Sequence, residues 1–494
     1  MDSLKSLVGV LRPSEKRLLL HYYSRNSNAQ EKLRLKLYKI IEAGIEDDEH
    51  AKVALGSAGG ASAYSHLKAR LKEDILNVLL TQETSKRFAQ ANRAAELDCR
   101  KKVAQSHLLL LRGAQVEGMK VLNKALKTAD RFELLAERLQ INHLLREKFL
   151  GAGSSAELTR LNDAISKDVK LYEALLYVEE QSFILTSPEY QQKLANRAYD
   201  KRNLDLIADL GKLFQKHKLA RIGFWYFMAA TEYHTVRKNY GEVVSLGLKF
   251  LKLVEKSPAV KSKNNAAGVN QTLGFAFLQL RKFGEAQSHL VVSEKLFAAS
   301  GFNRLQSLQL LVQSAMPQKE YVAVQKYVDV ALSHPRIERR EYLVPRWLFF
   351  KTSVLFARGD VDEAFTTLNR DGYLMKQQDE WNIQYRLLEM MILIEQVDEE
   401  WLEFKLDATR KFLTRHKNLD TPRVRAAVDV FSNILRKDLN FNELSSKNEK
   451  LLTKCLFEEQ GYEWNPAGAE LIRFDKWIES RRADYLDSKS DKTF

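Results

Sequence analysis

The stretch LGFAFLQLRKFGEA, residues 273–286, decides the fold of this chain. It places a glycine and an aromatic residue in one helical run, a second aromatic residue after a short turn, and a small residue at the start of the next run. Two helices that cross closely need small residues at their contact, and a large ring fills the adjacent gap. The stretch therefore predicts two antiparallel helices packed as a hairpin.

This hairpin resembles a tetratricopeptide repeat. In that family the first helix carries a small and then an aromatic residue, the turn carries an aromatic residue, and the second helix carries a small residue. The matching residues here are Gly274, Phe277, Phe283 and Ala286, and Ser293 stands in the later small-residue position. The resemblance implies an all-α, right-handed α-α superhelix, a solenoid of helical hairpins.

The same pattern recurs four more times. The turn and contact residues are Gly113 and Gly118, Tyr240 and Val243, Tyr321 and Val324, and Gly359 and Ala364. From Val243 to Ala364 the contact residues are 43, 38 and 40 positions apart, and Phe404 is expected to continue the series in a degenerate repeat. The family period is about 34 residues, so these helices resemble the extended repeats of bacterial peptide-sensing regulators. We expect seven or eight hairpins over residues 86–440.

Composition supports long helices joined by short loops. The chain of 494 residues is 45% hydrophobic and 29% charged, with only 8 prolines and 21 glycines. Loop-rich and all-β folds need more turn residues. Cys99 and Cys455 lie too far apart in sequence for a disulfide framework or a zinc motif, which favours a reducing compartment. With no apolar leader and no stretch long enough to span a membrane, a cytoplasmic location is expected.

Residues 1–85 are expected to form a separate helical module. Ser14 is a candidate cap for its first helix, and a second helix is predicted at about residues 31–43. A short third helix should follow the acidic run at 46–49, and a glycine-rich break at 56–60 should precede a helix at about 63–80.

The two ends of the chain supply further expectations. Residues 11–17, LRPSEKR, resemble the opening of uncharacterised bacterial repeat proteins, for which no activity is assigned. Residues 441–494 are expected to cap the array with a helix at 465–483, which buries Trp477, followed by a frayed polar tail.

Motifs for catalysis are missing from the sequence. The glycine-rich stretch at 56–60 lacks the Gly-Lys-Ser/Thr of a phosphate-binding loop, and the ten histidines are scattered without metal-ligand spacing. The acidic run at 46–49 lacks the alternating ligands and the glycine of a calcium loop. We therefore expect a protein that is not an enzyme, without catalytic residues, metal or cofactor.

The resemblance implies that the first helix of each hairpin lines a groove. Glutamine amides can bond an extended peptide backbone, and aromatic rings offer anchor pockets. Any of these side chains could instead pack against a neighbouring hairpin. Some family members hold acidic C-terminal peptides with lysines and asparagines, and the matching positions here carry Gln, Phe and Trp, which argues against that use. The predicted groove residues are Trp225, Met228, Glu232, Gln271, Phe275, Gln279, Gln306, Gln309, Gln313, Arg346, Phe349 and Ser353.

Basic residues gather elsewhere, and the formal charge of +14 permits an acidic partner or simply a well-solvated surface. Lys249, Lys252 and Lys256 share one face of a second helix, as do Lys120, Lys124 and Lys127. In the N-terminal module the candidate phosphate contacts are Lys68, Arg70 and Lys72.

Three functions compete at this point. The first is a scaffold or adaptor that captures another protein or peptide in the groove. The second is a peptide- or protein-responsive regulator with an N-terminal effector or nucleic-acid-binding module. The third is association with RNA or the ribosome through the basic outer helices, which should depend steeply on salt. No membrane partner is expected.

Overall fold

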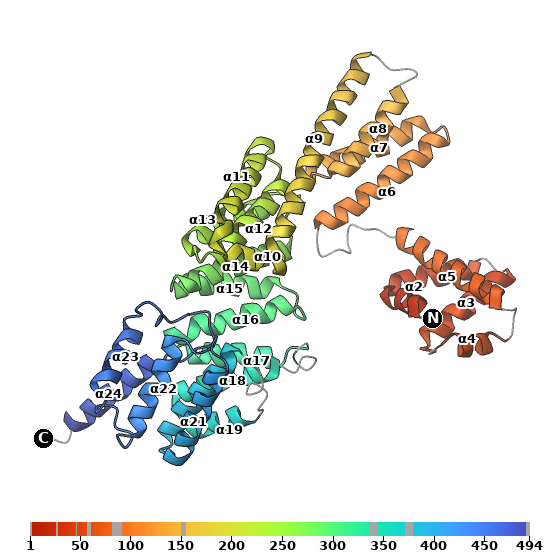
Figure 1. Ribbon diagram of the computed structural model, residues 1–494. Coiled ribbons are helices and arrows are strands. Elements are labelled where there is room, and N and C mark those ends of the chain that lie inside the picture. Colours follow the sequence, from red (N-terminus) through yellow and green to blue (C-terminus); the bar gives the residue numbers. More distant parts are fainter. Residues whose placement is uncertain are drawn as a thin grey trace. The chain divides into compact units, whose positions relative to one another are not determined.

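The computed structural model describes residues 2–25, 28–45, 47–56, 61–81, 91–149, 155–335, 337, 343–370 and 379–490. The elements that it describes are helices, which confirms the expected all-α array of helical hairpins (Figure 1). By proximity of Cα atoms the chain divides into two units, Met1–Asp168 and Val169–Phe494. The predicted division at residues 85 and 440 stays a prediction. Among the described residues, no helix combines the length and apolarity that a membrane span requires.

The first unit opens with five helices around a core of their own, in which Leu19, Leu37 and Ile75 are fully buried. The prediction of Ser14 as a cap is wrong by two positions, because the helix already begins at Pro13, a residue whose fixed φ suits a first turn, and Arg12 takes the cap position. Residues 57–60 of the predicted break at 56–60 lie outside the described residues. The helices are α1 (Asp2–Val10), α2 (Pro13–Arg25), α3 (Ala29–Glu42), α4 (Asp48–Leu55) and α5 (Ala61–Thr81).

The rest of the first unit contains the first predicted hairpin. Helix α6 (Ala91–Leu111) turns at Gly113 into α7 (Gln115–Arg131). Gly118 lies at their contact, where a Cβ atom would come within 2.9 Å of the Leu110 side chain. Helices α8 (Leu135–Phe149) and α9 (Ser155–Thr186) follow, and the latter runs on into the second unit.

In the second unit, hairpins follow one another from α12–α13 to α22–α23 (Figure 1). We call the first helix of each pair an inner helix and the second an outer helix, because the first is the more buried of the two. Thirteen of the 16 residues of α20 are buried, against four of the 17 residues of α21. The helices are α10 (Pro188–Ala195), α11 (Asp200–His217), α12 (Ala220–Val236), α13 (Tyr240–Lys256), α14 (Lys263–Gln279), α15 (Phe283–Leu296), α16 (Phe302–Ala315), α17 (Tyr321–Leu332), α18 (Leu343–Arg358), α19 (Val361–Asn369), α20 (Glu380–Glu395), α21 (Glu399–Arg415), α22 (Pro422–Leu435), α23 (Ser446–Leu456) and α24 (Phe474–Ser490).

One turn geometry repeats along this array. Each inner helix from α12 to α20 ends at a residue with positive φ, after which the next N–H bonds the carbonyl five positions back, as in a common helix-ending motif. These residues are Lys238, Arg281, Lys319, Gly359 and Val397. A fully buried residue of the outer helix follows each of them five positions later: Val243, Ala286, Val324, Ala364 and Leu402.

This register corrects one prediction. Phe404 does not lie at the helix contact, because its side chain is 61% exposed and stacks edge-on against Trp401. Leu402, which is fully buried, takes the contact position instead. The turn before it contains Val397, with neither the glycine nor the aromatic residue that marks the other turns, so the sequence pattern missed the register by two residues.

The hairpin that decided the fold shows why its small residue is needed. A Cβ atom on Gly274 would come within 2.4 Å of Leu290 Cγ on the facing helix α15. Real Cβ atoms do not approach so closely, so glycine lets α14 and α15 cross at this separation.

Candidate functional site

A non-helical stretch of the chain covers part of the predicted groove. Residues 457–473, which we call the C-terminal segment, connect α23 to α24 through turns and extended backbone. The predicted capping helix at 465–483 is therefore wrong at its start, because α24 begins at Phe474. Pro466 and Gly468 disfavour a helix here, and the Gly468 N–H bonds the Asn465 carbonyl in a turn at 3.0 Å. The buried position predicted for Trp477 is confirmed.

Glutamine side chains of two inner helices bond this segment. Gln313 of α16 is 1% exposed, and its amide nitrogen donates to the carbonyls of Ala467 and Gly468 at 2.8 and 2.9 Å. The amide nitrogen of Gln279, at the end of α14, donates to Asn465 Oδ1 at 3.0 Å. The sequence predicted such bonds to a partner peptide, but here the chain makes them to itself.

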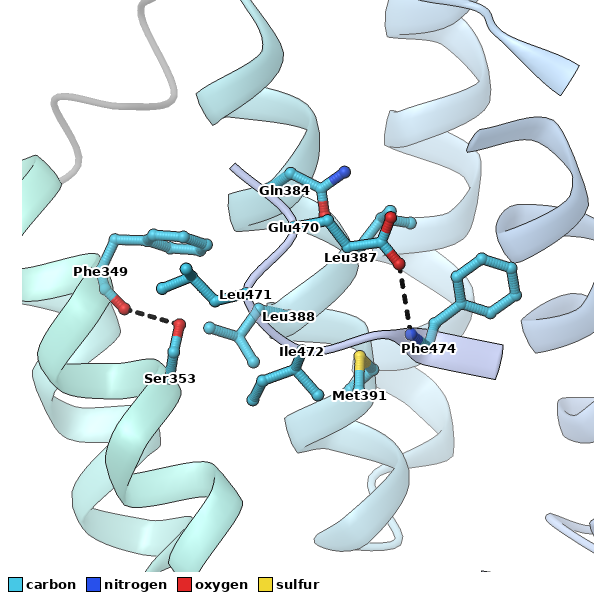
Figure 2. A pocket seen from close by; sticks show the side chains of 10 residues that line it. All are labelled: Phe349, Ser353, Gln384, Leu387, Leu388, Met391, Glu470, Leu471, Ile472 and Phe474. Atoms are coloured by element: carbon cyan, nitrogen blue, oxygen red, sulfur yellow. Dashed lines mark hydrogen bonds between the residues drawn. The ribbon is translucent and has the colours of Figure 1, made fainter. Parts of the chain in front are cut away.

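Apolar side chains hold the next part of the segment (Figure 2). Leu471 and Ile472 lie against Phe349 of α18 and against Leu388 and Met391 of α20. The empty space left between these residues is about 10 Å³, at the lower limit of what one water molecule needs. The segment therefore fills this part of the inner surface almost completely.

A buried ionic cluster fixes the end of the segment. Arg423 of α22 donates to both carboxylate oxygens of Glu470, each at 2.7 Å, and to Asp475 Oδ1 at 2.8 Å. Arg473 bonds Asp475 and also Glu458, with Nη1 to Oε1 at 2.8 Å. Bidentate guanidinium–carboxylate pairs combine strength with a fixed orientation. The cluster therefore holds the segment in one position against α22.

The cluster also changes the pKa of its members. Burial lowers the pKa of Arg423, but the carboxylates of Glu470 and Asp475 raise it more, so the guanidinium stays charged. Burial raises the pKa of Asp475, but the side chains of Arg473 and Arg423 bring it below its ordinary value. Both shifts favour the ionised Arg423–Asp475 pair, whereas burial raises the pKa of Glu470 although Arg423 lowers it.

The remaining predicted groove residues have two kinds of surroundings. Some contact neighbouring helices of the array, the alternative that the sequence left open. Trp225 Nε1 donates to Glu179 Oε1 at 2.9 Å, Gln271 bonds the Asn303 carbonyl at 3.0 Å, and the Arg346 guanidinium lies 4.4 Å from the Trp381 ring centre.

The others lie on inner helices toward the start of the array. Gln306 is exposed, and the side chains of Met228, Glu232, Phe275 and Gln309 are half-buried. Ser353, in contrast, is buried beside Phe349 and donates to its carbonyl at 2.9 Å. The structure therefore divides the twelve predicted residues into a covered set near the C-terminal segment, a set packed against neighbouring helices and a more accessible set on α12, α14 and α16.

The basic residues predicted to contact phosphate differ in their surroundings. Lys68 pairs with Asp48 at 2.9 Å, and Arg70 pairs with Glu73 at 2.9 Å, while Lys72 is exposed. Two of the three cations of the N-terminal module are thus already paired within it. Lys249, Lys252 and Lys256 lie together on the outer helix α13, as predicted, and border a surface hollow.

The two cysteines are buried, and neither forms a disulfide. Burial raises the pKa of the Cys99 thiol to about 11 and that of the Cys455 thiol to about 12. Both thiols are therefore protonated near neutral pH and poorly reactive. Within the described ranges, no group of three His, Cys, Asp or Glu side chains could hold a metal ion.

Sequence reasoning missed the residues that hold the segment, above all Arg423, Glu470 and Leu471. A signal was present in Asn465-Pro466-Ala467-Gly468, which is typical of a turn and breaks helical periodicity. Nothing in the sequence paired this turn with glutamines about 150 or more residues earlier.

Comparisons with known proteins place the chain in no family. No protein-family model matches it, and no curated protein matches it. A solved structure is similar to this chain. It is that of a Signal Transduction ATPase with Numerous Domains (STAND) protein from Pyrococcus horikoshii, which has a tetratricopeptide repeat sensor. The identity is 14% and the TM-score 0.37, over 86% of this chain and 56% of that one. This chain thus spans little more than half the length of that protein.

Proposed function

We propose that this chain is a non-catalytic scaffold that binds a segment of another protein on its inner helices. The observation that supports this proposal is the way the array holds its own C-terminal segment. Gln313 bonds two backbone carbonyls, and an apolar pocket beside Phe349 receives Leu471 and Ile472. These are the contacts by which a groove recognises an extended peptide.

The partner site that we propose lies on α12, α14 and α16. It is nearer the start of the array than the surface that the C-terminal segment covers. The bonds of the segment to inner helices begin at Gln279 and continue toward α22. Toward the start of the array, Phe275, Gln306 and Gln309 retain accessible surface. They offer the same chemistry as the covered part, amides beside an aromatic ring.

Phe349 is unsuitable for testing this site. It is 3% exposed and packs against Trp381, so its replacement by alanine should cost about 3–5 kcal/mol of stability. A loss of binding in that variant could then result from unfolding and would not identify a contact with the partner. The exposed or half-buried glutamines of α16 are better positions, because a longer side chain there can extend into solvent.

The test is capture of partners by the tagged chain from a native extract, with and without nuclease treatment. We compare the wild type with Gln306→Arg/Gln309→Arg and with a matched control on outer helices, Gln287→Arg/Gln325→Arg. A discrete set of proteins should be lost with the first variant and kept with the second. Equal capture by all three would exclude this inner surface, and partners that disappear on nuclease treatment would exclude the scaffold function.

The regulator and RNA-binding alternatives stay predictions. The pairing of Lys68 with Asp48 and of Arg70 with Glu73 gives no support to a phosphate-binding N-terminal module.

A further inference from the structure

A basic hollow opens between the helices α11, α12 and α13, away from the C-terminal segment. Its volume is about 480 Å³, and it is shallow and widely open to solvent, as a docking surface for a peptide segment is. Lys249, Lys252 and Lys256 border it from successive turns of α13. Its other lining residues are Phe214, Phe227, Leu253 and Ser257.

The floor of this hollow is apolar and firmly built. Phe214 packs edge-on against Phe227, with ring centres 5.7 Å apart, and Phe227 stacks on Phe250. Gly223 of α12 makes room for this floor, since a Cβ atom there would come within 2.5 Å of Phe214 and 3.0 Å of Leu253. The floor can therefore receive an apolar side chain without repacking.

The rim of the hollow is positively charged. All three lysines are exposed, and among the residues that the structure describes no carboxylate pairs with them. No acidic side chain lines the hollow. By contrast, Lys120 on α7 is paired with Glu117 at 2.7 Å. A ligand that fits must combine negative charge with an apolar group.

We propose that this hollow is a docking site for an acidic amphipathic segment of a partner protein, in which an apolar anchor is flanked by Asp or Glu. The anchor would cover Leu253 and Phe214, and the acidic residues would pair with the three lysines. This inference rests on the proposed scaffold function and gives it a second surface, on the outer side of the array. Complementary charge would also speed association with such a partner.

The aromatic floor favours this occupant over nucleic acid. Single-stranded nucleic acid is held by phosphate contacts together with exposed aromatic rings on which bases stack. Phe227 is buried and Phe214, only half-buried, stacks against Tyr226, so the floor offers a base less stacking surface than an exposed ring would. The phosphates of a nucleic acid would pair with the lysines but make no contact with the apolar floor.

Fluorescence anisotropy on the full chain tests the proposal. The probe is a labelled short peptide of alternating Glu-Glu and Leu-Phe pairs, compared with one of Glu-Glu and Ser-Ser pairs and with a labelled oligouridine. Lys249→Glu/Lys252→Glu/Lys256→Glu should weaken the first peptide about tenfold or more, because three exposed ion pairs are lost. The control Lys120→Glu/Lys124→Glu/Lys127→Glu makes the same charge change elsewhere and should leave the affinity unchanged.

Four results would overturn the docking site. These are an undetectable affinity for the Leu-Phe peptide, equal affinity for the Ser-Ser peptide, an equal loss in both lysine variants, or a preference for oligouridine. Each of them leaves the inner helices untested, so partner capture that still depends on Gln306 and Gln309 would preserve the proposed function. If that capture no longer depends on Gln306 and Gln309 while the peptide still binds at the lysines, the docking site stands and the proposed site on the inner helices fails.

Discussion

Arg423 and Glu470 face each other through two parallel hydrogen bonds, each 2.7 Å long, and so join an inner helix to the C-terminal segment. Both side chains lie almost entirely inside the protein. An isolated buried charge is strongly destabilising, whereas a paired one is tolerated.

Replacing Arg423 with alanine should therefore destabilise the chain by about 3–5 kcal/mol, because Glu470 would remain buried without its cation and Asp475 would keep only Arg473. The matched control is Arg425→Ala on the same helix, where an exposed guanidinium pairs with Asp420, and its cost should be at most about 1 kcal/mol. Urea unfolding of the full chain measures both. Equal effects would show that the cluster contributes no more than a surface pair.

Gly274 and Gly268, both on α14, should respond in opposite ways to alanine. At Gly274 the new methyl group would collide with Leu290, and the overpacking should cost about 1–3 kcal/mol. At Gly268 nothing lies within 4 Å of the position of a Cβ atom, so the higher helix propensity of alanine should stabilise the chain by about 0.5–1 kcal/mol. Thermal unfolding of the two variants distinguishes the positions, and a stabilising change at Gly274 would contradict the close crossing.

Gln313→Ala should cost about 1–3 kcal/mol, because it leaves the carbonyls of half-buried Ala467 and buried Gly468 without their donor. Gln306→Ala, at an exposed position of the same helix, should stay within about 0.5 kcal/mol of the wild type. Hydrogen exchange of the C-terminal segment provides a second readout, since faster exchange is expected only for the first variant. Unchanged exchange there would mean that Gln313 does not hold the segment.

Asp48 should give the N-terminal module an acid-sensitive contribution to stability. Burial raises the pKa of Asp48, but the hydrogen bonds from Lys68 and Tyr64 lower it by more, so that it falls to about 2. A lowered carboxyl pKa stabilises the fold above the ordinary value of about 3.9 and loses that effect as the pH falls toward 2. Because the Asp48 side chain is 36% exposed, solvent screening should keep the contribution below about 1 kcal/mol.

The measurement is urea unfolding between pH 5 and 2, followed by a fluorophore on Lys72→Cys. Asp48→Asn should remove the pH-dependent contribution, while Glu49→Gln, at an exposed carboxylate paired with Lys52, should leave it in place. An unchanged pH profile in Asp48→Asn would rule out this carboxylate as the source.

Much of the architecture could be predicted because packing restricts residue choice at helix crossings. Gly118, Ala286, Val324 and Ala364 are recognisable as small or compact residues at regular spacing, and the structure buries each of them. Phe404 failed as a prediction because the backbone turn at Val397 does not require a characteristic side chain.

For the candidate site, the sequence predicted the types of side chain that line it but not the segment that they contact. Glutamines and aromatic rings on the inner helices indicated a surface able to bind an extended peptide, and Gln313 makes such bonds. The sequence could not show that the chain supplies this peptide itself, because local periodicity carries no information about contacts between α16 and residues 467–468.

The C-terminal segment also changes how the array should unfold. In a simple repeat array each unit contacts only its neighbours, so terminal units can open one at a time. Here Gln279 bonds Asn465, 186 residues away, and Arg281 pairs with Glu458, 177 residues away. The last repeat cannot open without releasing contacts to α14, α16 and α18. We expect the hairpins from α14 onward to melt together, as one cooperative block without fraying from the C-terminal end.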